Sequence, residues 1–286
     1  MGIGLTMETS EQNNYQKKIA IINDLSGYGR CSITVQLPII SAMGIQTCPI
    51  PTGIFTNHTG FDSFAVKDCT DFLHSFIDEW KKVNISFDGI LIGYLTNPAQ
   101  IDFAKTFIEE FGKESTVILD PVMADNGEFY SGYDSKIAER LSELISYADI
   151  LTPNVTESCI LTGKQFKPYF KTDELTEMAE ILTRDRAKRV VITGIDSPGF
   201  VSSFAFESEN KESYKLYRKK KCHNERPGTG DVFSAVIAAD ALNGIEFLHS
   251  VERASDFVAK TLKVSDQNNT DSLNGVCFEN FMSIKI

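Results

Sequence analysis

Short apolar runs alternate with longer helical stretches through most of the 286-residue sequence, and this alternation constrains the fold more than any other feature. Apolar runs of about four to eight residues are typical of buried strands, whereas longer amphipathic stretches are typical of helices. When the two alternate, the chain forms right-handed βαβ units, and helices cover both faces of a mostly parallel sheet. The sequence therefore predicts an α/β fold.

The alternation assigns most of the chain to single elements. We expect strands at 18–23, 45–50, 88–94, 115–120, 149–152 and 189–193, and helices at 32–43, 68–82, 97–111, 134–147, 154–161, 175–187, 230–242 and 246–264. Two adjacent strands, 199–206 and 212–221, break the rhythm and indicate a hairpin. Residues 51–62 are polar and favour a loop, and residues 1–16 indicate a disordered or appended tail. Because no linker rich in Pro, Gly or Ser divides the remainder, we predict one domain over 17–286.

Composition excludes several classes of protein. Lys and Arg number 28 and Asp and Glu number 39, so the net charge is −11 and we expect no nucleic-acid partner. The sequence contains neither a signal-peptide apolar region nor an apolar stretch of about 18 residues, so we expect no membrane association and a cytoplasmic location. The six cysteines form no C-x-x-C pair, which favours free thiols over a zinc cluster or a disulfide scaffold.

Polar side chains stand where the predicted strands end. In an open parallel sheet, ligands bind beyond the carboxyl ends of the strands. The residues that end or directly follow a predicted strand are Asp24, Tyr94, Asp120, Thr152 and Thr193. We therefore expect these side chains to surround a ligand site at one edge of the sheet.

The sharpest local motif is Gly228-Thr229-Gly230-Asp231, which opens a predicted helix. Glycines let successive N–H groups point to one side, and the helix dipole adds positive potential, so this segment can form an anion hole. Asp231 would lie in the first helical turn and could accept a proton from an attacking hydroxyl. The structural alternative is an ordinary helix start with an aspartate in its first turn.

Two further carboxylates follow predicted strands. Asp120 ends one strand, and Pro121 forces an extended exit from it. Glu157 stands three residues after Asn154, a natural N-cap. Carboxylates in such places can hold magnesium, directly or through water. A solvated strand-end aspartate and a capping box between Asn154 and Glu157 are the structural alternatives.

Polar groups also follow the first two strands, around Asp24, Thr52 and 57–60. The structural alternative is that these residues only form turns. His58 has no partner at metal-ligand spacing. The segment 215–226 carries six basic residues just before the predicted anion hole. A solvated strand edge accounts for most of them, although one or two could face nucleotide phosphates.

Several familiar motifs are absent from the sequence. Without G-x-x-x-x-G-K-[ST] the chain is not a P-loop enzyme, and without G-x-G-x-x-G after the first strand it is not a Rossmann dehydrogenase. H-E-x-x-H and G-x-S-x-G are also missing, which argues against zinc peptidases and α/β-hydrolases.

In chain order, the separated motifs together resemble the ribokinase superfamily, and within it the pyridoxal kinase branch. The motifs are Asp24 with Tyr28-Gly29, Thr52 with Phe55-Thr56-Asn57-His58-Thr59-Gly60, Gly93-Tyr94, Asp120-Pro121-Val122, Thr152-Pro153-Asn154 with Glu157, Val191-Ile192-Thr193, and Gly228-Thr229-Gly230-Asp231. The likeness covers nearly the whole chain from about residue 18, and the segment 57–60 favours the vitamin B6 kinases.

The resemblance implies a single-domain ribokinase-like kinase that moves the γ-phosphoryl of ATP to the 5′-hydroxymethyl group of pyridoxal, pyridoxine or pyridoxamine. It implies ATP and Mg²⁺ as cofactors and leaves a monovalent-cation requirement open. It also implies a homodimer and a mobile flap over the active site, here residues 124–132.

The resemblance further implies roles for individual residues. Asp231 would be the base, and Gly228, Thr229 and Gly230 would supply N–H donors to the transferred phosphoryl group. The metal would be organised by Asp120 and Glu157. The nucleotide would be contacted by Thr193, Gly194 and Asp120, and the substrate ring by Asp24, Thr52, Tyr94 and His58.

One departure and three alternatives stand beside this interpretation. Pyridoxal kinases often carry serine where this chain has Asp24, and an acidic group there could pair with a protonated pyridine nitrogen or an amine. Hydroxymethylpyrimidine kinase, or the kinase of its phosphate, belongs to a sister branch with the same fold. A non-catalytic ligand-binding homologue is the alternative from another class, and a dehydrogenase is the most distant one.

Overall fold

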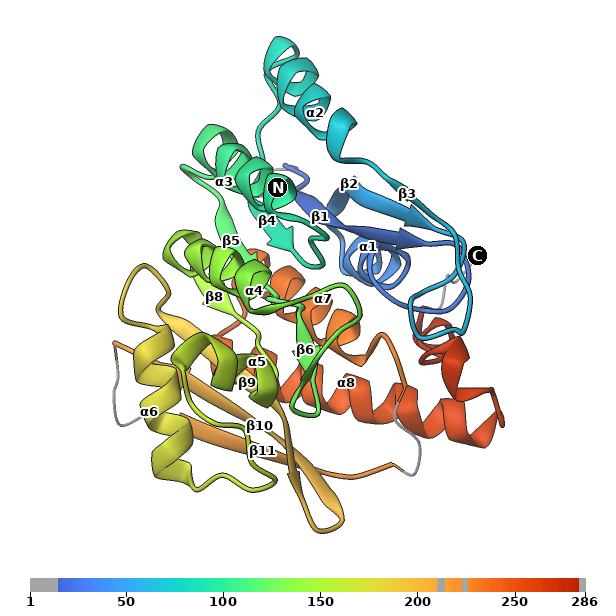
Figure 1. Cartoon of the computed structure of the whole chain (residues 1–286), viewed down its shortest axis with the longest axis vertical. Helices are drawn as coiled ribbons and strands as arrows, with labels where there is room; N and C mark the ends of the chain where they lie inside the picture. The colour runs from blue at the N-terminus through green and yellow to red at the C-terminus, as the bar shows by residue number, and fades with distance from the viewer. Residues whose placement is uncertain (1–14, 210–213, 223–225, 283–286) are drawn as a thin grey trace, which may run out of the picture.

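A nine-stranded sheet runs through the part of the chain that the computed structural model describes, residues 15–209, 214–222 and 226–282 (Figure 1). The strand order is β11-β10-β9-β8-β5-β4-β1-β2-β3. The strands are β1 (Lys18–Ser26), β2 (Gln46–Phe55), β3 (Val66–Asp68), β4 (Gly89–Ile92), β5 (Thr116–Leu119), β8 (Ile150–Leu151), β9 (Arg189–Ser197), β10 (Phe200–Glu207) and β11 (Tyr214–Lys220). The α-helices are α1 (Ile33–Ala42), α2 (Thr70–Lys82), α3 (Pro98–Phe111), α4 (Ser135–Ser142), α5 (Val155–Thr162), α6 (Thr172–Leu182), α7 (Thr229–Leu242) and α8 (Phe247–Gln267).

The six strands from β2 to β9 in this order pair in parallel, and antiparallel pairs occur at the two edges. The chain winds from β1 outward to β2 on one side and from β4 outward to β5, β8 and β9 on the other. The winding direction therefore reverses between β1 and β4, where open α/β sheets form their ligand crevice. The predicted α/β fold with a mostly parallel sheet is confirmed.

Each face of the sheet carries its own core, as expected for strands whose side chains alternate between the two faces. On β1, Ala20 and Ile22 pack with α2 to α6, whereas Ile19 and Ile21 pack with α1, α7 and α8. All four side chains are fully buried. The two helix groups accordingly lie on opposite faces of the sheet (Figure 1).

Three strands extend further than the sequence predicted. β2 does not end at residue 50 but continues to Phe55, because β3 pairs antiparallel with its last three residues. The predicted loop at 51–62 is therefore wrong over its first half. β1 runs on to Ser26 with a bulge between Asn23 and Leu25, and β9 runs past Thr193 to Ser197 because it pairs with β10. In each case the added residues pair with a neighbouring strand, β3 for β2, β2 for β1 and β10 for β9.

The expected flap at 124–132 contains a small hairpin of β6 (Ala124–Asp125) and β7 (Glu128–Phe129). Its turn residues Asn126 and Gly127 both have positive φ, of 51° and 85°. That pair of angles is typical of a type I′ hairpin turn, for which Asn-Gly is the preferred sequence. The hairpin is tied to the start of α5, since Asn154 donates to the Ala124 carbonyl at 2.7 Å.

Other expectations have mixed outcomes. The predicted tail falls almost entirely on residues 1–14, which lie outside the described residues, so its boundary stays a prediction. All six cysteines are free thiols, as predicted. None of the helices within the described ranges is both long enough and apolar enough to cross a membrane.

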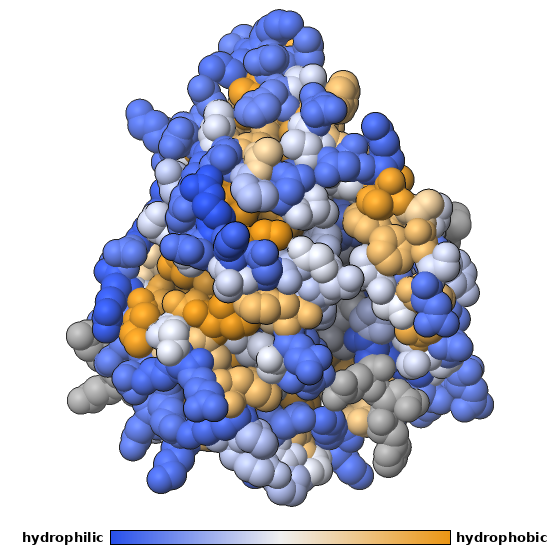
Figure 2. Space-filling view, viewed as in Figure 1, coloured by the Kyte–Doolittle hydropathy of each residue, from blue (hydrophilic) through white to orange (hydrophobic). Residues whose placement is uncertain are grey.

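The face shown in Figure 2 carries an apolar patch near the β3 edge of the sheet. Exposed large side chains in this region are Ile54, Phe64 and Val66, which are 47%, 41% and 51% exposed. A short edge strand flanked by exposed apolar groups is a common place for contact with another chain.

Candidate active site

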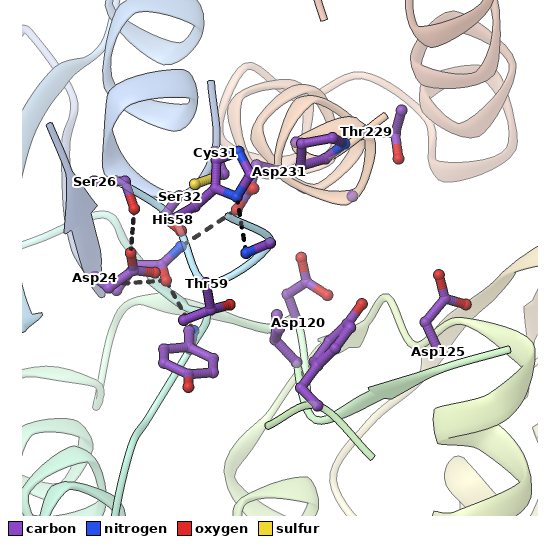
Figure 3. Close-up of a pocket in the computed structure, with 18 of the residues that line it drawn as sticks. Asp24, Ser26, Cys31, Ser32, His58, Thr59, Asp120, Asp125, Thr229 and Asp231 are labelled. Atoms are coloured by element: carbon purple, nitrogen blue, oxygen red, sulfur yellow. Dashed lines mark hydrogen bonds between the residues drawn. The ribbon is translucent and has the colours of Figure 1, made fainter. Parts of the chain in front are cut away.

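The carboxyl ends of the parallel strands and the start of α7 enclose a cavity of about 490 Å³. Figure 3 shows Asp24 and His58 on one side of it and Asp120 and Asp125 on the other, with Asp231 and Thr229 at the start of α7. The strand-end rule thus places the cavity correctly. All five residues that it selected line this cavity: Asp24, Tyr94, Asp120, Thr152 and Thr193.

The predicted ring-binding residues divide into two groups. Asp24, Tyr94 and His58 line the cavity, together with the aromatic ring of Phe55. Thr52 does not line it: its side chain is fully buried, and its hydroxyl donates to the Tyr94 carbonyl at 3.0 Å. Thr52 therefore supports the cavity wall from behind.

The His58 ring is held at both nitrogens. Nδ1 accepts from the Gly60 N–H at 3.2 Å, and Nε2 lies 2.7 Å from the Leu273 carbonyl oxygen. A nitrogen that accepts a backbone N–H carries no proton, so we assign the neutral tautomer with Nε2–H donating to Leu273. His58 thus offers a ring surface to the cavity and keeps its hydrogen bonds within the protein.

Asp24 is a buried carboxyl with polar neighbours. It is 5% exposed, and Ser26 Oγ donates to its Oδ2 at 3.1 Å. Burial raises the pKa of Asp24, since desolvation disfavours the charged form. Burial, together with the nearby Asp24, also raises the pKa of Tyr94 to about 12, so that phenol is neutral.

The glycines before and within the first turn of α7 differ in their surroundings. Gly228 has a φ of +83°, and a Cβ added there would lie 2.1 Å from the Arg30 carbonyl oxygen. A Cβ on Gly230 would meet nothing within 4 Å. Gly228 is therefore required by the fold, whereas the bare backbone at Gly230 borders open space in the cavity.

Among the described residues, no side chain at the N-cap position Gly228 caps the start of α7. The first N–H groups of a helix have no acceptor within the helix, and the helix dipole makes this end positive. With no capping oxygen at Gly228, these donors remain available at the cavity. A helix start of this kind can bind an anion, and the anion hole at this motif stays a prediction.

Asp231 lies partly buried in the cavity wall, and Asn23 Nδ2 is 3.4 Å from its Oδ1. Desolvation is the main reason that its pKa rises to about 6, and the nearby Asp24 adds to the rise. Hydrogen bonds from the Ser32 backbone and from Asn23 act in the opposite direction. The carboxyl faces the cavity with a proton affinity suited to a general base near neutral pH.

Asp120 and Glu157 are both buried and both line the cavity. Burial and the charge of Asp231 raise the pKa of Asp120 to about 7. Burial and the charge of Asp120 also raise the pKa of Glu157 well above its usual value. The capping box, which was the structural alternative for Glu157, is present: Glu157 N–H donates to Asn154 Oδ1 at 2.9 Å, and Asn154 N–H donates to Glu157 Oε2 at 2.8 Å.

This pair of carboxylates fits a magnesium ion. Neither residue forms an ion pair with a Lys or Arg among the described residues, and the charge of Asp120 makes Glu157 harder to ionise. Glu157 Oε1 also accepts the Met123 N–H at 3.1 Å, but each carboxylate oxygen has a second lone pair. Carboxylate oxygens are the ligands that Mg²⁺ prefers, often with water completing the shell. Within the described ranges, no group of three or more His, Cys, Asp or Glu side chains forms a metal cage.

A second cavity of about 290 Å³ adjoins the first and shares Thr193, Thr229 and Gly230 with it. Gly194, with a φ of 69°, lines the second cavity only. Thr193 does not end its strand as predicted, but it is where parallel pairing stops, at an isolated bridge to Asn154. Of the three predicted nucleotide contacts, Thr193 lines both cavities, Gly194 lines only the second and Asp120 lines only the first.

The basic segment at 215–226 behaves mostly as a strand edge. Lys219 pairs with Asp256, Lys221 pairs with Asp196, and Lys215 lies 4.0 Å from Glu252. Arg226 is buried and donates to the carbonyls of the 270–275 segment, so it braces the chain before the anion site. Lys220 lines the second cavity and makes no ion pair with any described residue. It is therefore a candidate contact for a phosphate.

Several residues of the site were not predicted as functional. Asn23 is fully buried and contacts Asp231, and Gln36 on α1 contacts Asn23 in turn. Tyr130 and Ser131 of the flap line the first cavity. Asn23 precedes Asp24 at the end of an apolar strand, and this polar residue at an inward-facing position was the signal that could have identified it.

The sequence matches the phosphomethylpyrimidine kinase family over residues 33–276. A crystal structure of a putative phosphomethylpyrimidine kinase from Bacteroides thetaiotaomicron, in a form with pyridoxal, is 34% identical and superposes with a TM-score of 0.90. That match covers 94% of this chain and 95% of the other. Pyridoxal kinase from Lactobacillus plantarum is 26% identical with a TM-score of 0.86, covering 94% and 96% of the two chains.

Among sequence relatives, a putative pyridoxal kinase from Schizosaccharomyces pombe is 27% identical over 66% of this chain. The match spans 57% of the length of that relative. Names of both kinds, pyridoxal kinase and phosphomethylpyrimidine kinase, therefore occur among the proteins that this chain resembles.

Proposed function

The chain belongs to the phosphomethylpyrimidine kinase family and is a pyridoxal kinase-like, ATP-dependent kinase of the ribokinase superfamily; from this premise we propose that it phosphorylates the 5′-hydroxymethyl group of a B6 vitamer. The vitamers are pyridoxal, pyridoxine and pyridoxamine. One observation carries the choice: the relative that is 34% identical over nearly its whole length was crystallised with pyridoxal.

The first cavity supports this choice. Its walls include the rings of Tyr94, Phe55 and His58, which suit a flat heteroaromatic ring. The buried Asp24 carboxyl is available to pair with a protonated pyridine nitrogen or an amine. Because a cationic partner would offset the desolvation that raises the pKa of Asp24, this residue would favour a ligand that carries a positive charge.

The reaction we propose is a direct transfer. The substrate hydroxyl oxygen forms a bond to the γ-phosphorus, the bond from that phosphorus to the bridging oxygen of ATP breaks, and ADP leaves. The hydroxyl proton passes to Asp231, which is the base. Asp231 is better suited to this role than an exposed aspartate, because its pKa of about 6 gives it greater proton affinity while leaving it mostly ionised at pH 7.

The backbone at the start of α7 would stabilise the phosphoryl group in flight. Phosphoryl transfer depends mainly on positioning and on stabilising charge over the equatorial oxygens. The N–H groups of Gly228, Thr229 and Gly230 would donate to these oxygens, and the open space at Gly230 leaves room for them. The flap at 124–132 would exclude water, since Tyr130 and Ser131 already line the cavity.

Asp120 and Glu157 would hold Mg²⁺, which when bound neutralises phosphate charge. The nucleotide would lie in the second cavity, contacted by Thr193 and Gly194 at its junction with the first. Lys220 would meet a phosphate there. Asp120 would serve both the metal and the nucleotide.

Hydroxymethylpyrimidine or its phosphate is the second candidate substrate, since the matched family carries that description. Its ring also bears a primary alcohol and fits the same reaction. A non-catalytic homologue is less well supported, because Asp231, Asp120 and Glu157 all line the cavity. The homodimer implied by the family stays a prediction that light scattering can test.

The decisive experiment is a substrate panel on the purified protein. ADP release is measured with pyridoxal, pyridoxine, pyridoxamine, hydroxymethylpyrimidine and its phosphate, and the products are identified by mass. We expect the highest kcat/KM with a B6 vitamer. A higher kcat/KM with a pyrimidine would overturn the vitamer assignment, and ligand binding without ADP release would overturn the catalytic one.

A further inference from the structure

Asn23 occupies an unusual place for an amide, a buried position in β1 just before the bulge. Ile19 and Ile21 of β1 face α1 and α7, and the period of two along a strand puts Asn23 on that same face. Its side chain is fully buried. A buried amide is costly unless its hydrogen bonds are made, so its partners indicate what it does.

All of the strong hydrogen-bonding positions of this amide are used. Oδ1 accepts the backbone N–H of Asp24 at 2.9 Å and that of Tyr94 at 2.8 Å. Nδ2 donates to Gln36 Oε1 at 3.0 Å and lies 3.4 Å from Asp231 Oδ1. Because Oδ1 faces two N–H donors, the orientation of the amide is settled, and its NH₂ group faces the carboxylate.

The surroundings hold the amide in this position. Gln36 Nε2 donates to Ser234 Oγ on α7 at 3.3 Å, so the acceptor that faces Asn23 is itself fixed. On the other side, a Cβ on Gly93 would lie 2.5 Å from Asn23 Nδ2, which shows how closely the backbone approaches. Asn23 therefore cannot swing away from Asp231 without disturbing α1, α7 or the turn after β4.

We infer that Asn23 is a positioning residue, which aims the Asp231 carboxylate at the substrate alcohol and holds it at a fixed distance from the substrate wall formed by Asp24 and Tyr94. The inference rests on the proposed role of Asp231 as the base. The Asn23 side chain contacts both the backbone of the substrate wall, at Asp24 and Tyr94, and the Asp231 carboxylate. A substrate ring bound against this wall would therefore present its alcohol to a carboxylate that is already in place. Such alignment contributes a large part of the rate in transfer reactions.

The contact between Asn23 and Asp231 also favours the ionised form of Asp231, against the larger effect of desolvation. The groups that face it from neighbouring elements are the carboxyls of Asp24 and Asp120, the thiol of Cys31 and the phenol of Tyr130. The carboxylates disfavour ionisation of Asp231, and the two neutral groups carry no positive charge. The Asn23 amide and the Ser32 backbone N–H are the donors that favour the ionised form. Loss of the Asn23 donor should therefore raise the proton affinity of Asp231.

The test uses Asn23→Asp, which keeps the shape and both bonds from Asp24 and Tyr94 but replaces the donor with a carboxyl. The titration of Asp231 is followed by ¹³C NMR with aspartate-selective labelling, and its resonance is identified by its loss in Asp231→Asn. We expect the midpoint to rise by about one pH unit or more, as for two carboxyls that share a site. In kinetics, kcat should fall by about 100-fold, as expected when a reacting group is misplaced, with KM for ATP little changed.

Two further variants separate positioning from general damage. Asn23→Ser introduces no charge and is too short to reach Asp231, so the midpoint should move in the same direction by less. Gln100→Leu removes another fully buried amide, one that bonds Thr52, Thr70 and Thr96. It should lower the melting temperature and leave the Asp231 midpoint where it is.

An Asp231 midpoint equal to that of the parent in both Asn23 variants would overturn the inference. The same result in Gln100→Leu as in Asn23→Ser would also overturn it, because the shift would then reflect general loosening. A parent that phosphorylates no alcohol in the panel would refute the proposed function instead. The NMR titration does not depend on turnover, so the two failures are distinguishable.

Discussion

The contrast between Gly228 and Gly230 allows the anion site to be tested apart from the fold. A methyl group is added by substituting alanine at each position in turn. At Gly230 it would enter open space, with no atom within 4 Å other than those of its chain neighbours and its own helix. At Gly228 it would lie 2.1 Å from the Arg30 carbonyl oxygen, on a residue whose φ is +83°.

The two substitutions are expected to affect different quantities, kcat at Gly230 and the free energy of unfolding at Gly228. Alanine is more favourable than glycine by about 1 kcal/mol inside a helix, so Gly230→Ala should unfold at the same temperature as the parent or slightly higher. Its methyl group would obstruct the space in which the N–H donors meet the phosphoryl group. Loss of one such donor costs about 100- to 1000-fold in kcat. At Gly228, the left-handed backbone alone costs alanine about 1–2 kcal/mol, and the clash with Arg30 adds to this.

Both variants are measured by thermal unfolding and by ADP release with the best substrate of the panel. We expect Gly230→Ala to be folded and nearly inactive, and Gly228→Ala to be destabilised. Near-parental kcat in a folded Gly230→Ala variant would show that the phosphoryl group does not pass this point of the backbone. The proposed role of the α7 start would then be wrong.

Three other predictions follow from the same site. Asp231→Asn should keep the fold and ATP binding, measured by calorimetry, and lose most of its turnover; turnover close to that of the parent would remove Asp231 from the role of base. Because Asp231 must be ionised to accept the proton, turnover should fall as pH drops through about 6. Without metal, the pKa values of Asp120 and Asp231 are about 7 and about 6. Their pKa values lie above those of the unfolded chain, so protonation favours the folded state, and the melting temperature without metal or nucleotide should rise as pH falls from 8 to 5. Asp231→Asn should reduce that rise, and an equal rise would contradict the assignment. Lys220→Ala should raise KM for ATP and spare kcat, with Lys215→Ala, outside both cavities, as the control; equal effects of the two variants would exclude Lys220 as a specific contact.

Thr52 shows that a sequence motif does not by itself tell whether a polar residue lines a cavity or supports its wall. As a motif, Thr52 belongs with the polar residues that follow the second strand, and the resemblance assigned it to the substrate. In the structure β2 continues past it, and its hydroxyl bonds the Tyr94 carbonyl behind the cavity wall. The extension depends on β3, a three-residue strand too short to show a periodic pattern. Only its pairing with Gly53–Phe55 defines it.

By itself, the sequence determined the α/β fold, the edge of the sheet that bears the site and the motif that opens α7, because alternation, strand ends and helix starts are local properties. Tertiary structure decided which polar residues face one another. Asn23 and Asp231 stand 208 positions apart, and they meet only because β1 and α7 pack on the same face of the sheet. The same holds for the two glycines, which look alike in the motif and differ because Arg30, from another part of the chain, lies against only one of them.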